Sequence, residues 1–171
     1  MIFTIQVSTH FIVGIIIQYL VFNYLKIFPI WALIIITIVF GFLSHAILDP
    51  LAAKFTYHPP EANWHDIFWV SYHLGIYILT IVVIIFFIQY WIGMIASIIP
   101  DILDWGARAL RKFKIFHLEW YNEPYVHNFI DRPMLNLMSG IKGNINKKSK
   151  VLFEIILDSL LLILAIIMVY F

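Results

Sequence analysis

The sequence predicts an all-α integral membrane protein, a polytopic bundle of about five membrane helices. Hydrophobic residues make up 63% of the 171 residues, and the mean hydropathy is +0.92. Charged residues make up 12%, whereas a soluble domain usually carries about 25%. Apolar runs of bilayer-crossing length alternate with short polar segments. We therefore expect a single integral membrane domain over residues 1–171, with a polar segment at about 104–150.

The first two apolar runs are expected to be membrane spans. The first extends from Phe11 to Leu25, and no basic residue precedes it in Met1–Ser8. We interpret it as a retained span and not as a signal peptide. The second run, Ile30–Leu48, has about the 20 residues that a bilayer requires. We expect it to end at Asp49 and Pro50, because proline has no N–H for the helical hydrogen bond.

The third apolar run, Ile67–Ile99, is too long for one untilted span and too short for two full ones. Its middle is aromatic, from Phe86 to Trp91, and aromatic side chains prefer the membrane interface. This pattern favours a hairpin. A full span would run from Ile67 to about Ile88, and a shorter helix would return from about Trp91 to Asp104. One long tilted helix is the alternative.

The remaining segments are expected to be a surface helix, a polar loop and a final span. Leu103–Phe116 alternates basic and large apolar residues, which is typical of an amphipathic helix at the headgroups. Trp120–Lys150 is polar and rich in turn-forming residues, and Val151–Phe171 is apolar again. With the hairpin, every lysine and arginine except Lys26 lies on one side. The positive-inside rule makes that side cytoplasmic, in a protein of the cell membrane.

Histidine and aspartate recur where the apolar runs begin or end. His45 and Asp49 are four residues apart, which places both on one face of a helix. His10 opens the first span, and Asp101 follows Pro100 at the end of the returning helix. In the hairpin all four lie at the same side of the membrane. Ionisable groups are costly there and usually mark a site.

These residue types suit a divalent metal ion. The chain has no cysteine, so only nitrogen and oxygen ligands are available. Imidazole and carboxylate together favour zinc, with manganese or iron also compatible. Ordinary roles explain the same residues one by one: Thr9 as a helix N-cap, Asp101 as a first-turn acid, and Asp104 as the ion-pair partner of Arg108. Further candidates lie in other segments: His58, His117 and His127 in polar loops, His65 and Asp66 opening the third span, and His73, Glu154 and Asp158 inside spans.

The order of the motifs resembles that of a known family. Thr9-His10-x3-Gly14, Ser44-His45-x2-Leu48-Asp49 and Pro100-Asp101-Ile102-Leu103 are followed by later histidines. This order is similar to that in small bacterial and archaeal membrane proteins related to the membrane-bound, metal-dependent hydrolases. The resemblance spans about Thr9 to His127. The His-Arg-x2-Thr-His-Ser segment typical of the hydrolase branch is absent from this sequence. The branch closest in motif order often has proline-histidine soon after the Leu-Asp pair, whereas here Tyr57-His58-Pro59 comes only nine residues after Asp49.

The resemblance implies a metal-dependent hydrolase acting at the cytoplasmic headgroup layer. The substrate would be a small phosphoester or a lipid headgroup, and the basic helix would attract anionic lipid. A metal-activated water is the expected nucleophile, with Asp104 or the loop histidine His117 as general base. The chain has no phosphate-cradling glycine-rich loop, and no nucleic-acid partner is expected. The residues expected to hold the metal are His10, His45, Asp49, Asp101 and, less directly, His127.

Two other function classes fit the same sequence. A non-catalytic membrane protein that packs with partners in a larger complex would use its buried histidines and aspartates to join helices. A proton-coupled transporter would need polar groups along its spans, and there are few: Gln18, His73, Gln89 and Asp158. Metal content distinguishes the hydrolase from the first alternative.

Overall fold

A computed structural model describes residues 7–56, 64–112, 125–137 and 146–171. These residues are helical apart from short connections, and no strand occurs among them. The all-α prediction is therefore confirmed. The helices, in chain order, are α1 (Val7–Tyr24), α2 (Ile30–Phe55), α3 (Ile67–Phe87), the 3-10 helix η1 (Ile88–Tyr90), α4 (Trp91–Ser97), α5 (Ile99–Lys112), α6 (Tyr125–Leu137) and α7 (Lys147–Tyr170).

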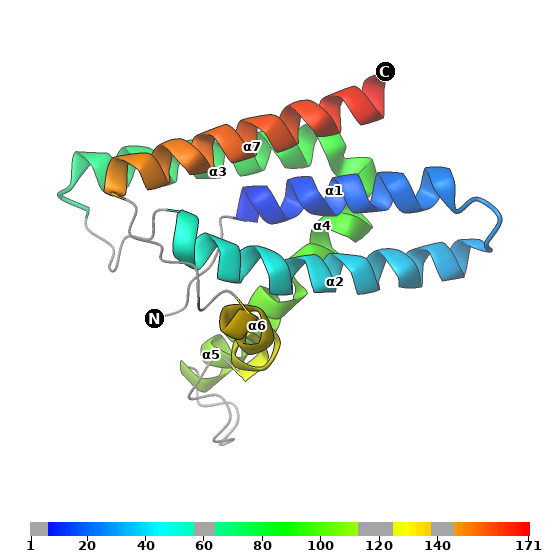
Figure 1. Ribbon diagram of the computed structural model, residues 1–171, viewed down its shortest axis with the longest axis horizontal. Helices are drawn as coiled ribbons and strands as arrows, with labels where there is room; N and C mark the ends of the chain where they lie inside the picture. The colour runs from blue at the N-terminus through cyan, green and yellow to red at the C-terminus, as the bar shows by residue number, and fades with distance from the viewer. Residues whose placement is uncertain (1–6, 57–63, 113–124, 138–145) are drawn as a thin grey trace.

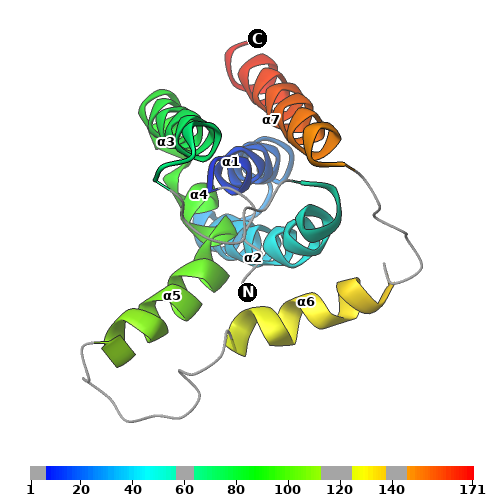
Figure 2. The same ribbon diagram turned by 90° about the vertical axis from the view of Figure 1, so that its left-hand side faces the viewer.

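Four apolar stretches are long enough to cross a membrane, which supports the membrane assignment. They comprise α1, most of α2, the stretch from α3 through α4, and α7. Figure 1 shows the long helices running side by side, and Figure 2 shows α1 in the middle of them. α1 contacts α2, α3, α4 and α7, and half of its residues are buried. It is therefore the central helix of the bundle.

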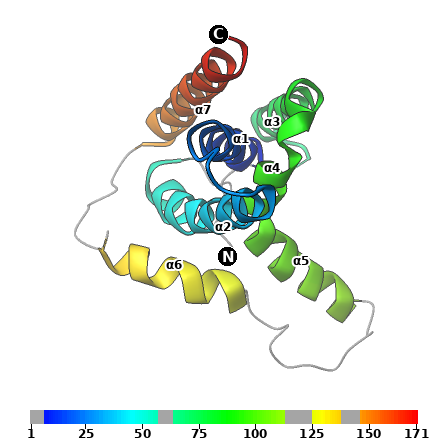
Figure 3. The same cartoon turned by 90° about the vertical axis from the view of Figure 1, so that its right-hand side faces the viewer.

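The predicted hairpin is confirmed, and one long helix is excluded. α3 ends at Phe87, η1 forms the turn, and α4 begins at Trp91. α4 then packs between α1 and α2 (Figure 1). The returning segment is two helices and not one, because Ile98 interrupts it with φ −115° and ψ 8°. α5 consequently leaves the bundle in a new direction, as Figure 3 shows.

Close backbone contact holds the returning segment against α1. A Cβ atom added at Gly93 would lie 2.0 Å from the carbonyl oxygen of Gly14, so only glycine fits this crossing. Gln18 of α1 accepts a hydrogen bond from the backbone N–H of Gly93 at 2.8 Å. That N–H lies in the first turn of α4, where no carbonyl of the same helix is available to it. Gln18 thus joins α1 to the start of α4.

Side-chain contacts align the helix starts at one end of the bundle. Thr9 of α1 donates a hydrogen bond to Asp158 of α7 at 2.6 Å, and Tyr72 of α3 donates one to Glu154 of α7 at 2.6 Å. At the opposite end, Tyr170 donates to the carbonyl oxygen of Phe86 at 2.9 Å. The starts of α1, α3 and α7 therefore share one end, as the hairpin prediction requires.

Two predicted boundaries are wrong. α2 continues through Pro50 to Phe55, although the sequence indicated an end at Asp49 and Pro50. Pro50 is fully buried, and the next turn is closed by the hydrogen bond from Thr56 N–H to the Ala52 carbonyl at 2.9 Å. Packing therefore compensates for the hydrogen bond that proline removes.

The second correction concerns the segment expected to be a turn-rich loop, Trp120–Lys150. It contains the helix α6 and the start of α7. The amphipathic helix expected at Leu103–Phe116 is present as α5, which begins earlier and is described to Lys112. Asp66 opens α3, as expected, by accepting hydrogen bonds from the N–H groups of Phe68 and Trp69.

Candidate metal site

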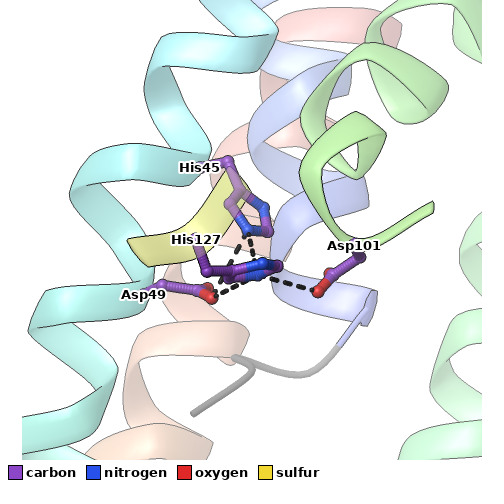
Figure 4. A group of neighbouring side chains, drawn as sticks. All are labelled: His45, Asp49, Asp101 and His127. Atoms are coloured by element: carbon purple, nitrogen blue, oxygen red, sulfur yellow. Dashed lines mark hydrogen bonds and ion pairs between the residues drawn. The ribbon is translucent and has the colours of Figure 1, made fainter. Parts of the chain in front are cut away.

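Four buried side chains from three helices converge at one end of the bundle. His45 and Asp49 come from α2, Asp101 from α5 and His127 from α6 (Figure 4). One nitrogen or oxygen atom from each lies within 4.8 Å of the other three. This group, called the four-residue cluster below, could hold a metal ion.

The distances within the four-residue cluster fit a small divalent ion. Nε2 of His45 lies 3.1 Å from Nε2 of His127, and each lies 3.4 Å from Oδ2 of Asp49. Oδ1 of Asp101 lies 3.2 Å from Nε2 of His127. Ligand atoms at about 2.0–2.1 Å from a tetrahedral ion are about 3.3 Å apart. Four of the six separations are therefore close to the edges of such a tetrahedron, and all four atoms lie within 4.8 Å of one another.

Both histidines have an acceptor behind them that turns Nε2 towards the cluster. Nδ1 of His45 lies 3.0 Å from the carbonyl oxygen of Ser97, which can only accept a hydrogen bond. Nδ1 of His45 therefore carries the proton, and in the neutral ring Nε2 carries the lone pair. Nδ1 of His127 likewise faces Oδ2 of Asp104 at 2.5 Å. Outer acceptors of this kind are typical of metal-binding histidines.

Helix ends supply these outer contacts. The carbonyl of Ser97 is at the last residue of α4, where a helix leaves its carbonyls without partners within the helix. The break at Ile98 leaves the Ser97 carbonyl available to His45. Asp104 accepts hydrogen bonds from the N–H groups of Val126 and His127 at 3.1 and 3.0 Å. These are first-turn donors of α6, so Asp104 caps α6 and places His127 in the cluster.

His10 lies beside the cluster. Its Nε2 atom is 3.0 Å from Oδ1 of Asp49, the oxygen that faces away from His45 and His127. The ring of His10 also stacks on the ring of His45, with centroids 4.3 Å apart and planes 20° from parallel. His10 was predicted to be a ligand. It lies outside the four-residue cluster, in contact with Asp49 and His45, and its role as a ligand stays a prediction.

Three carboxylates surround His127 and make its ring strongly basic. Burial lowers the pKa of His127, but hydrogen bonds with Asp101, Asp49 and Asp104 outweigh it and raise the pKa to about 11. Without a metal ion, His127 is therefore a cation between carboxylates. A metal ion would have to displace the proton on Nε2.

Asp131 is a further acid near the cluster that the sequence analysis missed. Burial raises its pKa to about 7, as do the negative charges of Asp49 and Asp101, although His127 and His45 oppose this. Its Oδ1 atom is buried and has no hydrogen-bond partner among the described residues. Asp131 follows His127 by four residues, the same spacing as His45 and Asp49. That repeated spacing was the available signal.

Most of the other residues named from the sequence lie outside the four-residue cluster or outside the described residues. Asp104 lies outside the cluster and holds His127, while His117 and His58 lie outside the described residues. Thr9 is inside α1 and is not its N-cap, and Asp101 is both a first-turn acid of α5 and a member of the cluster. The side chain of Arg108, the expected ion-pair partner of Asp104, is likewise not described. His73 faces the Trp69 carbonyl at 2.7 Å, and His65 is exposed.

Fold and site together define a helical membrane protein with a buried histidine–carboxylate cluster that could hold a metal ion. No protein-family model, curated protein or solved structure matches this chain.

Proposed function

We propose that this protein is a membrane-embedded, metal-dependent hydrolase whose ion is held by His45, Asp49, Asp101 and His127. The observation that carries the proposal is the convergence of two Nε2 atoms and two carboxylates within 4.8 Å of one another. The motif order, which resembles that of the membrane-bound hydrolase relatives, supports the same reaction class.

The donor set favours zinc, and manganese or iron would also fit. Two imidazole nitrogens and two carboxylate oxygens are ligands that all three metals accept. Neither oxygen of Asp101 accepts a hydrogen bond of good geometry from a described residue, although Oδ1 lies 3.2 Å from His127. A buried carboxylate in this condition is costly unless a cation lies next to it. In the metal-free protein protonated His127 is such a cation, and a bound metal ion would take over this role.

The residues around the ion have separable roles in this proposal. A bound divalent ion lowers the pKa of water towards about 7 and polarises the scissile group. Asp104 and the Ser97 carbonyl hold the two rings in position, and His10 holds Asp49. Since Asp104 is committed to His127, Asp131 is the described carboxylate best suited to accept a proton, because a general base works best with a pKa near 7. His117 stays a predicted alternative.

The place of the cluster supports a substrate at the membrane surface. The cluster lies at one end of the bundle, where α5 and α6 extend away from it (Figure 2). Both helices expose large apolar side chains: Ile102, Leu103, Phe129 and Leu137 are 49%, 51%, 78% and 78% exposed. Such helices bind the headgroup region. We propose a phosphoester or lipid headgroup as substrate, at the cytoplasmic face of the cell membrane.

One observation favours a non-catalytic alternative. All four positions of a tetrahedral ion would be filled by protein atoms, as in structural zinc sites, whereas catalytic sites keep one position open. A structural ion would join α6 to α2 and α5 and stabilise a surface for partners. For hydrolysis, one of the four side chains would have to leave room for a water next to the ion.

The deciding experiment is elemental mass spectrometry of the detergent-purified protein. We expect near-stoichiometric zinc, manganese or iron in the wild type, and loss of the metal in His45→Ala and Asp49→Ala. Asp66→Asn, at the start of α3, should keep the metal. The metal-loaded protein is then assayed on p-nitrophenyl phosphate and on phospholipid vesicles. Turnover that a chelator abolishes supports the hydrolase. Bound metal without turnover favours the structural role, and absence of metal after reconstitution refutes both.

A further inference from the structure

Two buried oxygen atoms at the four-residue cluster have no hydrogen-bond partner among the described residues: Oδ2 of Asp101 and Oδ1 of Asp131. Asp101 is only 7% exposed, and its other oxygen, Oδ1, lies 3.2 Å from Nε2 of His127. A metal ion in the cluster would therefore be bound through Oδ1 and would leave Oδ2 free. A buried carboxylate oxygen without a donor or a cation beside it is costly.

Asp131 borders the cluster from α6. It lies one helical turn beyond His127 and on the same face of that helix. α6 packs against α2 and α5, which carry Asp49 and Asp101, and the negative charges of these two residues act on Asp131. Asp131 is therefore close enough to share the electrostatic environment of the metal site.

The metal-loaded cluster has more negative charge than one divalent ion balances. Its carboxylates are those of Asp49, Asp101, Asp104 and Asp131, and both histidine rings are uncharged when their nitrogens bind metal. One divalent ion balances two of these charges, and a proton on Asp131 would balance a third. Among the described residues, no lysine or arginine forms an ion pair with Asp101, Asp104 or Asp131. Hydrogen bonds from α6 stabilise the charge of Asp104 but do not remove it.

His10 does not supply the missing positive charge. Its Nε2 atom faces Asp49 at 3.0 Å, but its Nδ1 atom is buried and has no hydrogen-bond partner among the described residues. A charged ring would carry a proton on both nitrogens, so Nδ1 would become a buried donor without an acceptor. The uncharged ring avoids this cost.

An anionic substrate would increase the excess of negative charge. The phosphoester of the proposed function is an anion, and a cluster with one ion would present unbalanced carboxylates to it. A second divalent cation would remove the excess and would give the phosphate oxygens a further positive site. Two-metal sites in phosphatases and nucleases stabilise the attacking and leaving oxygens in this way.

We propose that Oδ2 of Asp101 and Oδ1 of Asp131 hold a second divalent cation, magnesium or manganese, beside the ion of the four-residue cluster. Both metals accept carboxylate ligands, and magnesium is usually held by one or two carboxylates together with water and substrate phosphate. Asp101 bridges the two ions, which in two-metal sites lie about 3.5–4 Å apart. Oδ2 of Asp131 stays available to accept a proton. This inference rests on the proposed hydrolase and restricts its substrate to phosphoesters.

Titration of the metal-free full chain in detergent with Mn²⁺ tests the second site, because electron paramagnetic resonance measures the Mn²⁺ that remains free. We expect two ions per chain in the wild type. Asp131→Asn should weaken binding of the second ion at least tenfold and leave one ion bound. Asp66→Asn, an acid-to-amide change at the start of α3, should still bind two.

The spectrum of the bound ions is a second measurement and needs no variant. Two Mn²⁺ ions about 4 Å apart are magnetically coupled, whereas an ion bound elsewhere on the surface is not. Saturation at one ion, two uncoupled ions, or a coupled pair that persists in Asp131→Asn would each overturn the second site. One bound ion with chelator-sensitive turnover of p-nitrophenyl phosphate would overturn the second site alone. No bound ion would refute the proposed hydrolase as well.

Discussion

Asp104 joins His127 by two contacts from the same oxygen: Oδ2 lies 2.5 Å from Nδ1 of the ring and 3.0 Å from the backbone N–H. The carboxylate therefore fixes both the start of α6 and the orientation of the ring that α6 carries. Without this contact, the placement of His127 would depend on the packing of α6 against α2 and α5 alone.

The first prediction concerns this contact. Asp104→Asn keeps the shape of the side chain but removes the charge that orients and polarises His127. We expect metal affinity to fall about 10- to 100-fold, as for other outer-contact variants. Competition with a chromogenic chelator measures it. The matched control is Asp66→Asn, because Asp66 also accepts two first-turn N–H groups but lies at α3. Equal losses in both variants would show that the loss does not come from the contact with His127.

A second prediction concerns the helix crossing that positions the returning segment. Gly93→Ala places a Cβ 2.0 Å from the carbonyl oxygen of Gly14. Because this oxygen is a backbone atom, it cannot move aside as a flexible side chain could. Such overpacking typically costs about 1–3 kcal/mol. We expect a lower melting temperature in detergent. We also expect weaker metal binding, because the crossing positions α4, and α5, which carries Asp101, follows α4 directly. Gly75→Ala has open space around the new Cβ and should melt within a degree or two of wild type. A stable Gly93→Ala protein would contradict the described crossing.

Metal uptake should release a proton from His127. The pKa of about 11 means that the ring is charged at neutral pH in the metal-free protein, and a metal needs the uncharged nitrogen. Metal affinity should therefore rise about tenfold per pH unit from this group between pH 7 and pH 9. Calorimetry in buffers of different ionisation enthalpy counts the protons. An affinity independent of pH would show that Nε2 of His127 is not a ligand.

The same pKa shift has a consequence for the stability of the metal-free protein. In the folded protein the pKa of His127 lies above its ordinary value of 6.5. The stabilisation of the fold by protonated His127 is therefore complete below about pH 6.5, and it is lost as pH rises through about 11. α6 should therefore stay docked in metal-free protein at neutral pH. Hydrogen exchange of the α6 amides measures this docking, and exchange that is already fast at pH 7 would contradict it.

Asp131 should make the metal-free protein less stable as pH rises from about 4 to about 7. Its pKa is raised from 3.8 to about 7 in the folded protein, so over this window the folded state retains a proton that the unfolded state releases. By linkage, the free energy of unfolding then falls with pH and levels off above about pH 7. Melting temperatures across this range measure the effect. Asp131→Asn should flatten the profile, and an unchanged profile would contradict the shift.

The sequence alone predicted most of the membrane-spanning helices. Hydropathy is a sum over neighbouring residues, so the extent of α1 and α7 could be read within a few residues. The aromatic stretch before Trp91 predicted the hairpin turn, because aromatic side chains prefer an interface wherever the rest of the chain lies. Three residues of the candidate metal set, His45, Asp49 and Asp101, were also named from their positions at the ends of apolar runs, whereas His127 was named from a polar segment through the family resemblance.

Only the tertiary structure decided which of these groups meet. The polar composition of Trp120–Lys150 indicated a loop, but α6 forms there, and Asp104, more than twenty residues earlier, caps its first turn. His10 contacts Asp49, and Asp104 contacts His127, so both residues lie beside the cluster. No local sequence pattern encodes these contacts. The break at Ile98 and the Gly14–Gly93 crossing direct α5 towards α2. Hydropathy acts along the chain, whereas convergence of side chains depends on packing between distant segments.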